Sequence, residues 1–324
     1  MIHKKYYFNF GRSALKYGLL SYKIDFKKKI LIPDFICNEV TNALKEIKVP
    51  YSFYSVNDNL QPDWDQLNEI NSENYSSIIM IHYFGKPQDI NMFKKYSKEK
   101  NLFLIEDNAH GFGGEYNLKE MGTFGDFGIS SPRKIINSKY GGILYINKRM
   151  ENKVPLKKLP IANFIAYIHF IKNKHIKFLK LIKKFFLKRP LYENPYAFKE
   201  KDYRIFELDS FTKKFIKEND LNKIKKTRIQ IYNYWKLFSI KKNFKPVFQS
   251  LNDGATPWCF PVYVNSAQER LELLDWGWKN QLNIFTWPSL PQEIIKQNAS
   301  GYQRWSKLVC LSTDPSNLHI KKFL

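Results

Sequence analysis

Two short segments of the chain carry side chains that could do chemistry together. In the segment IEDNAHG, Asp107 follows the apolar run LFLI, so its carboxylate is expected at the end of a buried strand. There it could pair with the protonated ring nitrogen of a cofactor, because a nearby anion favours the charged form of a base. The alternative is structural, since Asp107 and Asn108 would also cap a following helix acceptably.

The second segment, GDFGISSPRKI, contains Lys134. An apolar, strand-like stretch precedes this lysine, Ile135 and Ile136 follow it, and a Gly-Gly turn comes shortly afterwards. A lysine in a partly apolar pocket loses its charge more easily and can form a Schiff base with a carbonyl compound. By residue type alone Lys134 is one lysine among many, and a surface charge is the default interpretation.

A candidate phosphate site lies near the amino terminus. Gly11, Arg12 and Ser13 come at a predicted helix start, where backbone N–H groups, the helix dipole, the Ser13 hydroxyl and the Arg12 guanidinium could hold a phosphate. The same pattern is also typical of an ordinary helix cap. His110 could contact the same cofactor as Asp107, although a single loop histidine is more often a packed or solvated residue.

Alternating apolar and amphipathic stretches indicate the elements that position these side chains. Strands are predicted at 28–33, 50–54, 76–82, 102–105 and 142–146, with helices at 37–47, 63–70 and 90–100. This alternation predicts an α/β fold with a mostly parallel sheet and helices on both faces. In such sheets ligands bind beyond the carboxyl ends of the strands, which is where Asp107 and the turn that begins at His82 fall.

After residue 192 the pattern changes to longer amphipathic stretches. Helices are predicted at 211–217, 221–238 and 270–276, with a strand at 257–264 and an aromatic, proline-containing loop at 284–291. We therefore expect a large domain over residues 1–208 and a smaller C-terminal α+β domain over residues 209–324.

The composition excludes several classes of protein. The chain has 324 residues, 44% apolar, which is too apolar for a chain held open by its charge. Its three cysteines are far apart, so neither a disulfide framework nor a cysteine-rich zinc module is expected, and no metal site is predicted. No signal peptide or membrane-spanning run is apparent, and the expected location is the cytoplasm.

Nearly half of the net charge of +23 lies in one stretch. Residues 152–192 hold eleven Lys and Arg and no Asp or Glu, with apolar residues recurring at near-helical spacing. We interpret this stretch as a basic amphipathic helix or helix pair. It could make peripheral contact with anionic lipid headgroups or attract a diphosphate-bearing substrate, or it could be a core-facing helix with a solvated lysine face. Nucleic acid is not an expected partner, because no nucleic-acid motif accompanies the charge.

The order of several motifs resembles the DegT/DnrJ/EryC1/StrS family of sugar aminotransferases, which depend on pyridoxal 5'-phosphate (PLP). The motifs are GRSAL, ILIPDFICNEV, IHYFGKPQDI, IEDNAHGFGG, MGTFGDFGISSPRKI and YGGILYI. The resemblance implies the aspartate-aminotransferase-like fold (fold type I) and a homodimer with active sites at the interface. It also implies transfer of an amino group, typically from L-glutamate, to a nucleotide-linked keto sugar.

The resemblance also implies roles for individual residues. Lys134 falls at the position of the Schiff-base lysine, and Asp107 at that of the aspartate that pairs with the pyridinium nitrogen. His110 matches the position near the phenolic oxygen of the cofactor. Arg12 and Ser13 fall in the phosphate-holding segment, Ser131 matches a serine that also contacts the phosphate, and Phe35 is assigned as the aromatic residue over the ring.

The resemblance therefore implies an aminotransferase that makes an amino sugar for surface polysaccharide. The lysine at position 134 favours transamination over the dehydratases of this fold, which carry histidine there. Only ten residues precede Gly11, fewer than in typical members, and the spacing from Asp126 to Lys134 is two residues shorter than in many. Two alternatives are a lipid-linked or non-sugar acceptor, and an idle member of the fold that binds a membrane or partner through 152–192.

Overall fold

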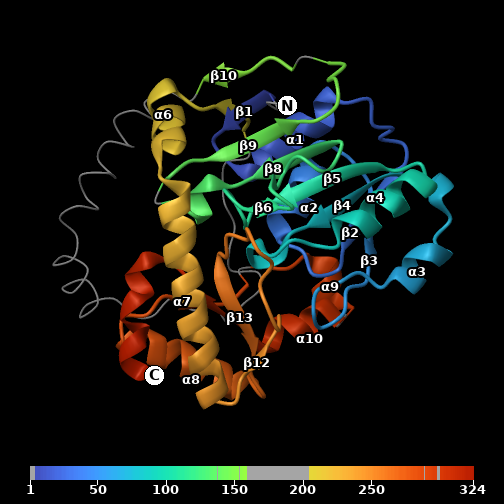
Figure 1. Ribbon diagram of the computed structural model, residues 1–324. Helices are drawn as coiled ribbons and strands as arrows, with labels where there is room; N and C mark the ends of the chain where they lie inside the picture. The colour runs from blue at the N-terminus through green and yellow to red at the C-terminus, as the bar shows by residue number, and fades with distance from the viewer. Residues whose placement is uncertain (1–3, 137, 153, 159–203, 288, 298–299) are drawn as a thin grey trace.

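The computed structural model describes residues 4–136, 138–152, 154–158, 204–287, 289–297 and 300–324 (Figure 1). Its largest element is a nine-stranded sheet. In spatial order the strands are β10 (Lys157–Lys158), β11 (Phe206–Glu207), β1 (Lys4–Phe8), β9 (Gly142–Ile146), β8 (Phe127–Ser130), β5 (Phe103–Asn108), β4 (Tyr75–Ile81), β2 (Lys29–Pro33) and β3 (Tyr51–Tyr54).

The central part of this sheet is parallel. Strands β3, β2, β4, β5 and β8 run in one direction, whereas β9 pairs antiparallel with both β8 and β1. Every strand and helix predicted within the first 146 residues overlaps an observed element. The expectation of a mostly parallel α/β sheet is therefore confirmed, with antiparallel strands added at one side.

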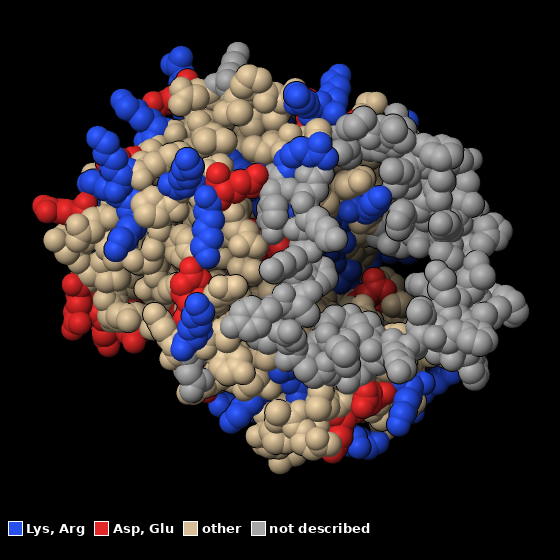
Figure 2. Space-filling view, turned by 180° about the vertical axis from the view of Figure 1, so that it is seen from behind, with Lys and Arg blue, Asp and Glu red and all other residues tan. Residues whose placement is uncertain are grey.

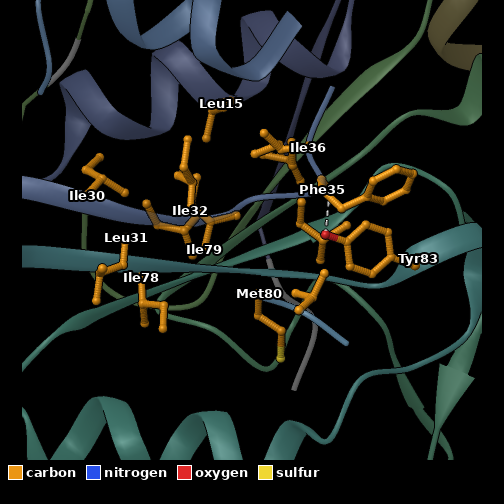
Figure 3. Close-up of a cluster of buried hydrophobic side chains, with 14 of the residues drawn as sticks. Leu15, Ile30, Leu31, Ile32, Phe35, Ile36, Ile78, Ile79, Met80 and Tyr83 are labelled. Atoms are coloured by element: carbon orange, nitrogen blue, oxygen red, sulfur yellow. Dashed lines mark hydrogen bonds between the residues drawn. The ribbon is translucent and has the colours of Figure 1, made fainter. Parts of the chain in front are cut away.

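The helices of this part of the chain pack on both faces of the sheet. They are α1 (Gly11–Ser21), α2 (Asn38–Glu46), α3 (Trp64–Glu69) and α4 (Ile90–Glu99), joined by the short 3-10 turns η1 (Ser72–Asn74), η2 (Tyr83–Gly85) and η3 (Pro132–Lys134). In Figure 3, Leu15 of α1 points toward the side of the sheet that carries Ile32 and Ile79, while Leu31 and Ile78 point to the opposite side, where α4 lies. Because successive strand residues face opposite ways, these buried strands need apolar residues at every position.

The C-terminal part of the chain forms a second, four-stranded sheet. Its strand order is β12 (Lys245–Pro246), β13 (Cys259–Tyr263), β15 (Leu308–Ser312) and β14 (Ile284–Phe285), all antiparallel. Its helices are α6 (Ser210–Glu218), α7 (Leu221–Lys241), α8 (Ala267–Lys279), α9 (Gln292–Lys296), α10 (Ser300–Lys307) and the 3-10 segment η4 (Pro315–Phe323). A small hairpin, β6 (Glu115–Tyr116) and β7 (Lys119–Glu120), lies between β5 and β8 in sequence.

The described strands of the large sheet end at Glu207, and those of the small sheet begin at Lys245. The domain division at 208–209 remains a prediction. The loop expected at 284–291 contributes the short strand β14, because its first two residues pair with β15. Most of the basic stretch 152–192 lies outside the described residues, so the helix predicted there remains a hypothesis.

Helix starts distinguish α1 from most of the longer helices. A side-chain oxygen accepts a hydrogen bond from the first turn of α3, α4, α6, α7 and α8; the capping residues are Asp63, Asp89, Asp209, Asp220 and Ser266. At α1 the residue before the helix is Phe10, whose side chain makes no capping hydrogen bond.

No helix among the described residues combines the length and the apolar composition that a membrane span requires.

Candidate active site

A cavity of about 480 Å³ lies at the carboxyl ends of the parallel strands, between the two sheets. Five of the seven residues predicted for the site line it: Arg12, Asp107, His110, Ser131 and Lys134. These residues come from α1, from the end of β5 and the turn after it, and from the segment after β8. The fold therefore brings together groups that lie more than a hundred residues apart in the sequence.

Lys134 ends the short turn η3 and is partly buried. Its Nζ lies 4.6 Å from the centre of the ring of Trp258, the residue directly before β13 of the other sheet. Burial lowers the pKa of the Lys134 ammonium group, and the neighbouring Cys37 and Asp107 oppose that shift. A lysine in this position is neutral at a lower pH than an exposed one, so its amine becomes available as a nucleophile.

Asp107 lies on β5 and is buried, with 6% of its surface exposed. Its Oδ1 accepts a hydrogen bond of 2.8 Å from the backbone N–H of Ala109. Burial raises the pKa of this carboxyl group, while the Ala109 N–H and Lys134 lower it. The residues that follow form a turn and not a helix, so the helix-capping alternative for Asp107 is wrong.

The adjacent acid, Glu106, has a different environment because successive strand residues face opposite sides. It is fully buried, and its Oε1 lies 2.9 Å from Nε2 of His82. The backbone N–H groups of Gly122, Phe124 and Gly125 also donate to its two oxygens. These bonds hold the pKa of Glu106 below its usual value despite burial. Glu106 is therefore a structural anion behind the strand that presents Asp107.

His110 stacks on Trp258, with the ring centres 4.6 Å apart and the planes 23° from parallel. Its Nδ1 accepts a hydrogen bond from the backbone N–H of Phe84, which places the ring proton on Nε2. Burial and the nearby Lys134 hold the pKa of His110 well below its ordinary value. His110 is thus a neutral hydrogen-bond donor in the cavity wall, not a bystander in solvent.

The start of α1 forms another wall of the cavity, through Gly11 and Arg12. The Arg12 guanidinium donates to Glu39 at 3.0 Å and lies 4.2 Å from the centre of the Phe10 ring. Ser13 does not line the cavity; it is fully buried one residue further on, and its Oγ has no hydrogen-bond partner among the described residues. Ser131 faces Gly11, where an added Cβ would lie 3.5 Å from the Ser131 Cβ.

Phe35 does not line the cavity. It is fully buried against Trp287, with ring centres 4.8 Å apart, and its backbone oxygen accepts a 2.5 Å hydrogen bond from Tyr83 (Figure 3). The structure therefore contradicts its assignment as the aromatic residue over the ring. Among the aromatic residues that line the cavity, Trp258 contacts Lys134 and stacks on His110.

Sequence reasoning predicted none of the eight cavity residues from the C-terminal part of the chain, among them Arg228 and Trp258. Arg228 of α7 is 2% exposed, and it donates to the backbone oxygen of Ile135 at 2.6 Å and to Thr313 at 3.0 Å. Burial lowers its pKa to about 10. Through the hydrogen bond to Ile135, this arginine holds α7 against the segment directly after Lys134. Nothing in its spacing distinguishes it from the many other basic residues.

The Lys and Arg side chains of the described residues do not form a single patch on the face shown in Figure 2. Lys and Arg side chains are spread over the described surface there, with Asp and Glu among them. The described residues therefore give no support for one basic docking surface on this face.

Residues 7–154 match the model of the DegT/DnrJ/EryC1/StrS aminotransferase family. This match confirms the resemblance inferred from the motif order over that part of the chain. GDP-perosamine synthase of Escherichia coli O157:H7 is 30% identical over 142 residues, which are 43% of this chain and 39% of that protein. In sequence, the chain thus spans well under half the length of this curated relative.

Solved structures extend the likeness to nearly the whole chain. PseC of Helicobacter pylori, an aminotransferase involved in pseudaminic acid biosynthesis, covers 98% of this chain and 85% of its own, with a TM-score of 0.70 and 17% identity. Spr1654 from Streptococcus pneumoniae in its PLP form covers 99% of this chain and 88% of its own, with a TM-score of 0.70 and 12% identity. These likenesses confirm the predicted fold type I architecture.

Proposed function

We propose that this chain is a PLP-dependent aminotransferase that moves an amino group from L-glutamate to a keto sugar carried by a nucleotide. The observation that carries the proposal is that Lys134 and Asp107 line one cavity together with the uncapped start of α1. A curated relative named GDP-perosamine synthase supports the sugar acceptor, and the expected product is an amino sugar for surface polysaccharide.

The residues present fit PLP. Phe10, the residue before α1, makes no side-chain capping hydrogen bond, and the partial positive charge of a helix start suits a phosphate group. The Ser131 hydroxyl lines the cavity and is a further candidate contact for that phosphate, whereas the buried Ser13 Oγ is not. Asp107 is a buried carboxylate that would pair with a pyridinium nitrogen. When bound, PLP supplies an aldehyde for the amino group and a ring that withdraws electrons from the neighbouring carbon.

The chain's own residues then have separable roles. Lys134 Nζ, with its lowered pKa, would hold the cofactor at its aldehyde and, once the amino donor has displaced it, would take and return a proton as a general base. Asp107 holds a proton at the ring nitrogen by stabilising the cation beside it. His110 donates from Nε2 toward the cavity, and the Trp258 ring lies against both His110 and Lys134, which excludes water from this side.

Trapping of the cofactor tests the proposal without relying on turnover. The purified chain is mixed with PLP, reduced with borohydride and digested, and the peptide that carries the added mass is identified. We expect the label on Lys134 in the native chain. Lys139→Ala should keep the label, because Lys139 is an exposed lysine five residues away. A label spread over several surface lysines, or its persistence in Lys134→Ala, would contradict the proposal.

Substrate assignment needs a second experiment. L-glutamate should convert the bound PLP to its amine form, with loss of the visible absorption and release of 2-oxoglutarate. Thermal-shift screening of nucleotide sugars, followed by turnover with the matching keto sugar, then identifies the acceptor. Conversion by glutamate without any nucleotide-sugar response would favour the lipid-linked or non-sugar acceptor, and no conversion would favour an idle member of the fold.

We further propose that two copies of the chain pair, as the family resemblance implies. Light scattering coupled to size-exclusion chromatography measures this directly, with twice the chain mass as the expected result. A monomer at the concentrations used for activity would contradict it.

A further inference from the structure

A second hollow, of about 590 Å³, lies apart from the cavity described above and shares no lining residue with it. Its walls come from the loop after β3, the segment between η2 and α4, the loop after β12, and Tyr116 of the β6–β7 hairpin. These segments belong to both halves of the chain, so the fold builds the hollow by bringing separate loops together.

The lining of this hollow is rich in carboxamide side chains. Six of its thirteen residues are Asn or Gln: Asn59, Gln61, Gln88, Asn91, Gln249 and Asn252. Each carboxamide offers two N–H donors and a carbonyl acceptor without a charge. A sugar hydroxyl also donates and accepts, so a wall of carboxamides matches a polyhydroxylated ligand better than it matches an ion or an apolar molecule.

Gln88 has a fixed side-chain orientation in the wall of this hollow and is not a flexible surface residue. It is only 6% exposed, and its backbone N–H donates to Nδ1 of His82 at 3.0 Å. Its Nε2 donates to the Leu60 backbone oxygen at 2.6 Å, which fixes the orientation of the amide. The Oε1 atom is left buried without a partner among the described residues. An unpaired buried acceptor is costly, and a ligand hydroxyl would satisfy it.

The remaining side chains make the hollow amphipathic and nearly neutral. Tyr116 and Phe248 contribute aromatic rings, which suit the C–H faces of a sugar ring. Lys86 lies 5.3 Å from the centre of the Phe248 ring, and burial lowers its pKa. The Asp89 carboxylate balances its charge and accepts the N–H of Met92 at the start of α4. This balance gives no strong attraction for a phosphate.

We propose that this hollow binds a carbohydrate through its carboxamide groups, as a site separate from the cavity of Lys134. The proposal does not depend on the aminotransferase activity. Gln88 Oε1 accepts a hydrogen bond from one hydroxyl, and the exposed carboxamides of Asn91, at the start of α4, and Gln249, in the loop after β12, contact the same ligand.

Saturation-transfer NMR on the full chain tests this proposal, with D-glucose, D-galactose, D-mannose and N-acetyl-D-glucosamine as probes. We expect the ring protons of at least one probe to receive saturation. Asn91→Ala combined with Gln249→Ala should weaken that binding about tenfold or more, because two hydrogen-bonding groups are removed. Gln268→Ala, an exposed carboxamide on α8 outside the hollow, is the matched control and should leave the affinity unchanged.

The outcomes separate this site from the main cavity. Saturation that survives the double substitution would place the sugar elsewhere and overturn the proposal. No saturation of any of the four probes would overturn it as well. Displacement of the bound sugar by inorganic phosphate would show that Lys86 dominates the hollow and that it is an anion site. Because both substituted residues are exposed, the variants should fold, which circular dichroism checks.

Discussion

Replacing Glu106 by Gln tests whether the buried anion behind β5 stabilises the fold. Glu106 is fully buried, and its Oε1 takes hydrogen bonds from His82 and Gly122, while Oε2 takes them from Phe124 and Gly125. A Gln amide turns one of these oxygens into a donor, so two N–H groups then face an N–H₂ group whichever way the amide is oriented.

The expected loss follows from the number of bonds affected. Two charge-assisted bonds are lost and a buried partner is left unpaired, which together cost about 3–5 kcal/mol of unfolding free energy. For a chain of this size that corresponds to a decrease in Tm of roughly 10 °C. Thermal unfolding followed by circular dichroism, together with urea unfolding, measures both quantities.

Glu120→Gln is the matched control. Glu120 accepts from Lys5 at 2.7 Å, but both side chains are about a third exposed, at 35% and 28%. Solvent screens such a pair, and the expected loss is about 0–1 kcal/mol. If Glu106→Gln costs no more than Glu120→Gln, the argument for a structural anion fails.

The pH dependence gives a second check on Glu106. Its pKa is lower in the folded chain than the ordinary value of 4.5. As the pH falls, this carboxylate therefore takes up a proton in the unfolded chain before it does so in the folded chain. The stability that the anion contributes is fully present above pH 4.5 and is lost as the pH falls through the lower pKa of the folded chain. The difference in unfolding free energy between the native chain and Glu106→Gln should be constant near neutral pH and should decrease in acid. A difference that grows in acid would contradict this assignment.

Three further predictions concern the cavity. Lys134→Met should raise the unfolding free energy at neutral pH, because burial lowers the pKa of Lys134 in the folded chain below 10.5. Between the two pKa values the unfolded chain binds more protons, so the native chain should gain stability as the pH rises toward 10.5. The difference in unfolding free energy between the variant and the native chain should therefore narrow in urea unfolding measured over this pH range. Asp107→Asn should retain PLP in equilibrium dialysis but slow conversion by glutamate at least a hundredfold in stopped-flow absorbance, and an unchanged rate would refute its role at the ring nitrogen. Ser131→Ala should lower the unfolding free energy of the cofactor-free chain by no more than about 1 kcal/mol, because its Oγ makes one described hydrogen bond, of 3.4 Å, to the Gly141 backbone oxygen. PLP should dissociate several-fold faster from this variant, and an unchanged dissociation rate would refute the contact with the phosphate.

Local sequence was sufficient for the elements that frame the site. The apolar runs that became β2, β4 and β5 are buried on both faces, so their pattern is continuous and easily recognised. The position of Asp107 beside the last strand residues followed from the same pattern. Motif order also indicated Lys134, which composition alone could not separate from the other lysines.

Side-chain direction was not readable from local sequence. Phe35 lies in a matching motif but packs away from the cavity against Trp287, a residue from the other half of the chain. The sequence likewise shows two adjacent acids, and only the position of His82 and three backbone N–H groups decides that Glu106 is structural while Asp107 lines the cavity.

The sequence by itself therefore determined the parallel sheet, because burial and strand alternation are short-range patterns, and its motif order indicated the residues that we propose for the chemistry. Tertiary structure alone decided which aromatic ring covers the cavity, that Arg228 fastens α7 beside Lys134, and that separate loops enclose a second polar hollow. Those features depend on contacts between residues more than ninety positions apart, and no local pattern records which distant side chain will fill a given space.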